Sequence, residues 1–353
     1  MSGPDAPGRI WRRLLCTGLA AFGLMLLRTM PAAAFHLTDP WPDADSLSGI
    51  EGERVSLESS DPFAPRDIGR ARARTVTGLL FLPPNARGDH AVPAVVMLHG
   101  SAGLIADRAK YGPQLAAMGI AVLLIETYDS RRDLATSFVG RVLAITETMF
   151  VADAYGGLRY LAGRPEIDPR RVVLAGFSYG GMAATYALYA QMADALAPPG
   201  LRFAGHVAYY APCIARFRDS RTTGAPLLML YGGQDQLMRS SRCDEIAGDL
   251  RGGGSEVTII VYPTAVHQWD GGRPRGLIGR QLADCRFVVE PDGTVRDART
   301  AIPMSGPFLR KIILGLCTGS RPYPIGRDDA VRAQSNRDFG RFLARVLREH
   351  PRS

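Results

Sequence analysis

The chain has 353 residues, of which 46% are hydrophobic and 22% are charged, and its formal net charge is +8. This composition is typical of a globular protein and excludes a disordered or a fibrous chain. Arginines are spread among acidic residues, and no dense run of basic and aromatic residues predicts binding to nucleic acid.

The chain begins with the features of a secretory signal peptide. Three arginines precede a 14-residue apolar run at 14–27, and small residues follow at 31–34. This order predicts export by a Sec or a twin-arginine route, with cleavage near Ala34 and loss of residues 1–34. A helix that spans a bilayer needs about 20 apolar residues, so we expect no stable membrane span. The mature protein is expected in the periplasm or outside the cell.

Strands and helices are predicted to alternate along residues 35–353, which we expect to form a single domain. Val55 and Leu57 mark a possible first strand. The other strands are expected at 76–82, 94–98, 121–125, 172–176, 203–210, 226–231 and 257–262. Helices are expected at 108–118, 145–161, 181–192, 240–251 and 333–348. Such alternation indicates an α/β fold, with a mainly parallel central sheet and helices on both faces.

The strand at 94–98 runs into His99-Gly100-Ser101-Ala102-Gly103. Small residues at such a turn let backbone amides approach an oxyanion, so the Ser101 amide is a candidate oxyanion donor, with Ala102 as the alternative. His99 is expected to be a structural hydrogen-bonding residue beneath this loop.

Four residues are candidate substrate contacts. Tyr128 and Trp269 could form an aromatic wall, and Arg131, with its neighbour Arg132, could anchor a substrate carboxylate. The alternatives stay open, because aromatic residues also pack in cores and loop arginines are often only solvated.

The run at 172–181, Val-Val-Leu-Ala-Gly-Phe-Ser-Tyr-Gly-Gly, is an apolar strand that ends in Gly-x-Ser-x-Gly. A serine on a sharp turn between a strand and a helix needs small neighbours, and Gly176 and Gly180 meet that need. We therefore predict that Ser178 is a nucleophile and that the Tyr179 amide is the second oxyanion donor.

A serine nucleophile needs a base, and the base needs an acid that orients it. Asp235 ends the strand at 226–231 through a glycine turn, and His267 follows the strand at 257–262. The order serine, aspartate, histidine is that of the triads found in α/β-hydrolases. Asp244 and Glu245 are the alternatives for the acid.

The stretch at about 268–327 departs from the alternation and is predicted to be an insertion in the domain. About 60 residues without strong periodicity indicate a functional loop, a cover or a surface excursion. Because the stretch follows His267 directly, it could overhang the site, and an excursion away from the site is an equal alternative.

Four cysteines remain after removal of the signal peptide. An even number in an exported protein favours disulfides, and three pairings are possible. We predict Cys213 with Cys243 and Cys285 with Cys317, with free thiols or another pairing as the alternatives. No metal site is predicted, because no Cys-x-x-Cys motif or histidine pair has ligand spacing.

Together, the loop at 99–103, the Gly-x-Ser-x-Gly turn, the Asp235 turn and the run at 262–267 resemble the dienelactone hydrolase branch of the α/β-hydrolases. The resemblance covers about 75–267 and the final helix. It implies an α/β-hydrolase fold and hydrolysis of a small ester or lactone without a cofactor. Dienelactone hydrolases use a cysteine nucleophile, whereas this chain has Ser178, so a serine esterase is the function that we expect.

Two kinds of alternative remain. The same scaffold and triad could serve a peptidase or an acyltransferase, because a fold does not determine the acceptor of the acyl group. A non-catalytic binding scaffold is the other alternative, although a binding module has no need for the complete set of catalytic residues. The sequence does not determine the physiological substrate or the oligomeric state.

Overall fold

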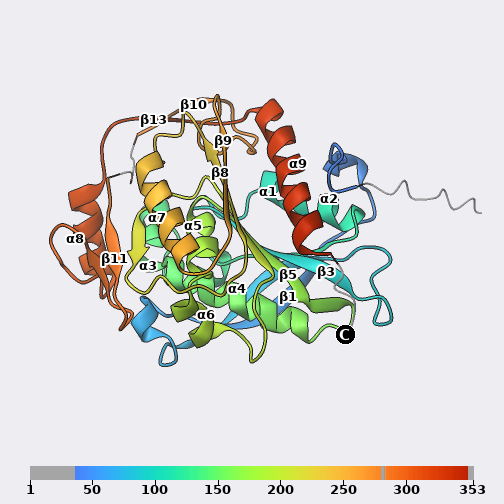
Figure 1. Cartoon of the computed structure of the whole chain (residues 1–353), viewed down its shortest axis with the longest axis horizontal. Helices are drawn as coiled ribbons and strands as arrows, with labels where there is room; N and C mark the ends of the chain where they lie inside the picture. The colour runs from blue at the N-terminus through green and yellow to red at the C-terminus, as the bar shows by residue number, and fades with distance from the viewer. Residues whose placement is uncertain (1–35, 280–281, 283, 349–353) are drawn as a thin grey trace, which may run out of the picture. The chain divides into compact units, whose positions relative to one another are not determined.

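The computed structural model describes residues 36–279, 282 and 284–348. The predicted signal peptide and its cleavage point at Ala34 lie outside the described residues. The central sheet has eight strands: β1 (Glu53–Ser60), β2 (Ala73–Phe81), β3 (Val92–Leu98), β4 (Ala121–Ile125), β5 (Ile167–Phe177), β6 (Gly205–Tyr209), β8 (Leu227–Gly232) and β9 (Val257–Tyr262). Their order is β1-β2-β4-β3-β5-β6-β8-β9 (Figure 1). The neighbours from β4 to β9 are parallel, and β1 and β2 add an antiparallel edge.

Helices pack on both faces of this sheet. The helices of the described residues are α1 (Ala106–Ala109), α2 (Tyr111–Ala117), α3 (Phe138–Ala144), α4 (Glu147–Ala162), α5 (Tyr179–Tyr186), α6 (Ala190–Leu196), α7 (Ser240–Gly252), α8 (Pro307–Cys317) and α9 (Asp329–Val346). The expected fold class, a mainly parallel sheet between helices, is confirmed. None of the helices in the described part of the chain has both the length and the apolar character needed to cross a membrane.

Alternation along the buried strands divides the core into two layers. Side chains that are neighbours in a strand point to opposite faces of the sheet. In β3, Val96 and Leu98 pack in a cluster with residues of α4 and α5, whereas Val95 and Met97 pack in a second cluster with residues of α2 and α9. The central strands β3, β4, β6 and β8 are buried on both faces, which is why they appear in the sequence as continuous apolar runs.

The seven expected strands correspond to β2–β6, β8 and β9, and β1 contains Val55 and Leu57. Two expected helices are divided in the structure: the one at 108–118 breaks at Lys110 between α1 and α2, and the one at 181–192 breaks between α5 and α6. Between them Tyr189 stacks on Phe217, with ring centroids 3.9 Å apart, and the Ala190 amide donates a hydrogen bond to the Arg221 carbonyl. These contacts with strand β7 (Ala215–Phe217) and the loop after it draw the backbone out of helical geometry.

The stretch at 268–327 contains regular elements that the sequence did not predict. Strand β10 (Gly276–Ile278) pairs with β13 (Tyr323–Ile325), and β11 (Phe287–Val289) pairs with β12 (Val295–Asp297). Strand β11 also pairs in parallel with β7 (Ala215–Phe217), outside the stretch. A disulfide joins Cys285 to Cys317 at the end of α8. The stretch is therefore tied to the rest of the fold at several points.

His206, in β6, is a buried histidine that should make stability depend on pH. Its Nδ1 lies 2.8 Å from the Ala184 carbonyl oxygen, and its side chain is fully buried. Burial lowers the pKa of His206 from 6.5 to about 4. Between these values the unfolded chain binds a proton that the folded protein does not, so stability is lost as the pH falls from about 6.5 towards 4.

Replacing His206 by asparagine keeps a donor for the Ala184 carbonyl but removes this titration. Between pH 7.5 and pH 5, we expect the free energy of unfolding of His206→Asn to fall by about 1–2 kcal/mol less than that of the wild type, because one pKa unit is worth about 1.4 kcal/mol. Urea unfolding at the two pH values measures the difference. Equal losses in the two proteins would contradict the prediction.

Candidate active site

Ser178 lies on a sharp turn between β5 and α5. Its backbone has φ 51° and ψ −109°, a conformation that is rare for a residue with a side chain. The turn is possible because glycines stand two residues before and two residues after Ser178. A Cβ atom on Gly176 would collide with the Gly180 carbonyl oxygen, and one on Gly180 would lie 2.5 Å from the carbonyl oxygens of Leu98 and His99. The Ser178 amide donates a hydrogen bond to the Tyr209 carbonyl at the end of β6.

The structure brings Ser178, Asp235 and His267 together at the carboxyl ends of β5, β8 and β9. His267 Nε2 lies 2.8 Å from Ser178 Oγ, and His267 Nδ1 lies 2.7 Å from Asp235 Oδ2. A carboxylate only accepts hydrogen bonds, so Nδ1 carries the proton and Nε2 is free to accept the serine proton. Asp244 and Glu245, the alternatives for the acid, have exposed side chains in α7.

Backbone contacts hold the two partners of Ser178. Asp235 Oδ1 accepts a hydrogen bond of 2.9 Å from the Leu237 amide, which orients the carboxylate. The His267 backbone forms a bridge with Ile325 of β13, and its carbonyl accepts a hydrogen bond of 2.9 Å from the Gly326 amide. The stretch at 268–327 therefore returns to the histidine loop and supports it.

A buried polar network, which the sequence analysis missed, supports the face of the His267 ring. The Tyr210 ring lies 4.8 Å from the imidazole, edge to face. Its hydroxyl donates to Asp270 Oδ1 at 2.6 Å and accepts from Arg108 at 2.7 Å. Tyr210 stands at the end of an expected strand beside the active-site edge, and this position was the only signal in the sequence.

The loop at 99–103 lies against the serine turn. A Cβ atom on Gly100 would be 3.2 Å from the Phe177 carbonyl oxygen and 3.5 Å from Ser178 Cβ. Ser101 is the residue after Gly100, so its amide lies next to this contact. Tyr179 is the first residue of α5. The two candidate oxyanion donors thus come from segments that meet beside Ser178.

His99 lies beneath this loop in the role that the sequence suggested. Its Nδ1 lies 2.8 Å from the Gly100 carbonyl oxygen, and its Nε2 accepts a long hydrogen bond of 3.4 Å from the Tyr128 amide. Burial lowers the pKa of His99 to about 4, so the ring is neutral near pH 7. With both nitrogens occupied, His99 positions the loop.

Three of the four predicted substrate contacts, Tyr128, Arg131 and Trp269, have buried side chains, and this burial corrects the expectation that they face a substrate. Arg131 donates two hydrogen bonds of 2.7 Å to Asp153 and one of 2.8 Å to Asp61, so its charge is neutralised inside the protein. Trp269 donates to Ser335 and packs on Tyr210. Tyr128 packs beneath the loop with its ring 4.9 Å from that of His99. Arg132 is exposed and pairs with Asp129.

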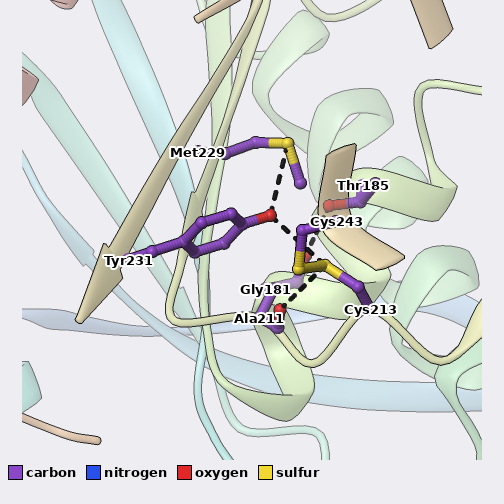
Figure 2. Close-up of a disulfide and its surroundings, with 7 residues drawn as sticks. All are labelled: Gly181, Thr185, Ala211, Cys213, Met229, Tyr231 and Cys243. Carbon is purple, nitrogen blue, oxygen red and sulfur yellow. Dashed lines mark hydrogen bonds between the residues drawn. A yellow bond between two sulfur atoms is a disulfide. The ribbon is translucent and has the colours of Figure 1, made fainter. Parts of the chain in front are cut away.

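A disulfide joins Cys213, in the loop after β6, to Cys243 in the first turn of α7 (Figure 2). Tyr231 Oη lies 3.3 Å from Cys213 Sγ, and it donates to Met229 Sδ at 3.4 Å. The bond connects the loop beside the nucleophile helix with the helix that follows the Asp235 loop. This pairing and Cys285–Cys317 are those expected from the sequence. Within the described part of the chain, no group of three or more His, Cys, Asp or Glu side chains is placed to hold a metal ion.

Comparisons with known proteins identify the family of this chain. The model of the dienelactone hydrolase family matches residues 76–275, a range that includes Ser178, Asp235 and His267. The chain is 27% identical over 235 residues to the Salmonella typhimurium protein named "Putative carboxymethylenebutenolidase", a match that covers 60% of this chain and 84% of that protein. It is also 27% identical over 274 residues to an uncharacterized protein of Mycobacterium tuberculosis, with 72% and 85% covered.

Two solved structures have a similar fold. A dienelactone hydrolase-like promiscuous phosphotriesterase from metagenomic libraries has a TM-score of 0.54 and 15% identity, with 84% of this chain and 99% of that chain covered. Esterase 2 of Thermogutta terrifontis has a TM-score of 0.51 and 12% identity, with 87% and 98% covered. At these identities, the similarity concerns the fold alone.

Proposed function

Because this chain belongs to the dienelactone hydrolase family, a family of hydrolases, we propose that it is an exported serine hydrolase that cleaves a carboxylic ester or a lactone. The observation that carries the proposal is the continuous chain of short hydrogen bonds from Asp235 through His267 to Ser178. A serine becomes a useful nucleophile only when a base in this arrangement can take its proton.

The proposed reaction has two steps. His267 Nε2 takes the Ser178 proton while Oγ attacks the substrate carbonyl, and the amides of Ser101 and Tyr179 donate to the oxyanion that forms. His267 then protonates the leaving alcohol, which leaves an acyl group on Ser178. In the second step His267 takes a proton from water, the hydroxide attacks the acyl group, and Ser178 regains its proton as the acid is released. Every proton moves through His267, so the scheme needs no cofactor.

Export and domain organisation are part of the same proposal. Residues 1–34 would be removed, and residues 35–353 would form one domain with an insertion at about 268–327. The two disulfides support an oxidising compartment, because disulfides are rare in proteins that stay in the cytosol.

A fluorophosphonate probe tests whether Ser178 is activated. The probe phosphonylates a serine whose proton a base removes, so we expect one adduct on Ser178 of the mature protein and none in Ser178→Ala. Tryptic digestion and mass spectrometry locate the adduct. Ser240→Ala, which changes an exposed serine at the start of α7, should label like the wild type. A folded wild-type protein without an adduct would contradict the proposal and favour a binding scaffold.

Hydrolysis assays then distinguish the possible substrates. With short-chain esters, lactones and peptides supplied to unlabelled mature enzyme, we expect turnover of the esters and the lactones. Turnover of peptides alone would contradict the proposed esterase and indicate a peptidase that uses the same triad.

A further inference from the structure

Arg310, on α8 in the stretch at 268–327, is a buried cation that the proposed reaction does not use. Its side chain is 4% exposed, and it points into the protein from a helix that lies far from Ser178 in the sequence. Nη1 and Nη2 each donate to one oxygen of Glu147, at 3.0 Å. Nε donates to the Val142 carbonyl at 2.9 Å, which ties α8 to α3.

Arg310 Nη1 also donates to Met304 Sδ at 3.2 Å, and a further contact of this guanidinium leads to the candidate oxyanion hole. Arg310 Nη2 donates to Tyr179 Oη at 2.9 Å, and Tyr179 Oη donates to the Ile145 carbonyl, also at 2.9 Å. Burial raises the pKa of Tyr179 well above its usual range, so the hydroxyl keeps the proton that it donates. The phenol is held from two sides, and its ring packs on that of Phe150 at 5.1 Å.

Tyr179 directly follows Ser178, and its backbone N–H is the proposed second oxyanion donor. The peptide that carries this N–H lies in the rare conformation of the serine turn, so its orientation depends on contacts that hold its neighbours in place. A fixed phenol ring restrains the Tyr179 backbone, because the side chain is anchored at both its Cα and its hydroxyl. An oxyanion donor acts well only when its direction is set before the reaction.

We propose that Arg310 is a positioning residue for the oxyanion hole: it holds the Tyr179 phenol and thereby aims the Tyr179 amide. Through this contact the stretch at 268–327 takes part in catalysis, although none of its side chains need touch the substrate. The inference rests on the proposed function, in which the Tyr179 amide stabilises the oxyanion. Loss of the contact between Arg310 and Tyr179 should therefore lower kcat and change KM little, because the oxyanion forms only after the substrate has bound.

The test uses two independent variants. Tyr179→Phe keeps the ring and removes the hydroxyl, and it leaves the pair of Arg310 and Glu147 intact. The double variant Arg310→Met, Glu147→Gln removes the cation without leaving a buried carboxylate unpaired. Lys311→Gln, which changes the exposed neighbour of Arg310 on α8, is the matched control. Each mature protein is compared with the wild type for its melting temperature, for its kcat and KM on a p-nitrophenyl ester, and for its inhibition by a boronic acid that forms a tetrahedral adduct with serine.

We expect kcat to fall about 10- to 100-fold in both Tyr179→Phe and the double variant, less than the about 10²- to 10³-fold lost when an oxyanion donor is removed outright. The inhibition constant of the boronic acid should rise by a similar factor, while KM changes less than about threefold. Combining both sets of changes should add little to either loss, because they break the same contact. Lys311→Gln should match the wild type.

A purely structural role has a different signature. A lower melting temperature with unchanged kcat and unchanged boronic acid inhibition would overturn the proposal, as would losses that simply multiply in the combined variant. If the double variant fails to fold, Tyr179→Phe decides by itself. Absence of a fluorophosphonate adduct on wild-type Ser178 would instead refute the proposed function, so the two failures are distinguishable.

Discussion

Replacing His267 by alanine is expected to lower kcat for ester hydrolysis by about 10⁶-fold, close to the loss caused by removal of a triad serine or histidine. The reason is that His267 Nε2 is the group placed to take the Ser178 proton, at 2.8 Å from Oγ. His99, the histidine of the neighbouring loop, has both ring nitrogens occupied, so it offers no substitute. Steady-state kinetics of the purified mature protein measure the loss.

The matched control is His90→Ala, which removes an exposed histidine and should leave kcat unchanged. Circular dichroism and melting temperature establish that His267→Ala is folded. Residual activity above about 1% of the wild type in a folded His267→Ala protein would mean that another group serves as the base.

The second large effect is expected for Asp235→Asn, a change that keeps the shape of the side chain. Asp235 Oδ1 already accepts from the Leu237 amide, so the asparagine oxygen should occupy that position and its NH₂ group should face His267. Two donors cannot share a hydrogen bond, and His267 would then carry its proton on Nε2, where it cannot accept the serine proton. We expect kcat to fall about 10⁴-fold, with KM nearly unchanged.

Asp244→Asn is the comparison that tests the choice of acid. Asp244 was the alternative from the sequence, and its exposed position in α7 predicts wild-type kinetics. Loss of activity in Asp244→Asn with normal activity in Asp235→Asn would reverse the assignment. Fluorophosphonate labelling of Asp235→Asn should slow in proportion to kcat, since both reactions need the same base.

The structure of the stretch at 268–327 could be predicted only in small part from the sequence. The sequence left open whether the stretch at 268–327 covers the site or lies away from it. In the structure β13 supports the His267 loop, while α8 packs beside α3 (Figure 1). The strands that the structure describes in this stretch are each three residues long, which is too short for a periodic pattern in the sequence. One of them, β11, pairs with β7, which lies outside the stretch.

The predicted substrate contacts failed for a related reason. The sequence shows that Arg131 is charged and follows a strand, but its fate depends on Asp153, 22 residues away, and on Asp61. Trp269 is buried because α9 supplies Ser335 for its indole N–H. The side chain of a loop residue near an active-site edge can point to solvent or into the core. The sequence around the residue does not distinguish these two orientations.

Local physics explains what the sequence determined by itself. Continuous apolar runs marked the parallel strands, and the glycines around Ser178 marked a turn that other residues could not form, so the fold class and the order of the candidate triad were both readable along the chain. Only the tertiary structure decided the short hydrogen bonds within the triad, the burial of Arg131, and the contact of Arg310 with Tyr179, which are 131 residues apart. Such contacts depend on the packing of distant segments, and no spacing in the sequence encodes them.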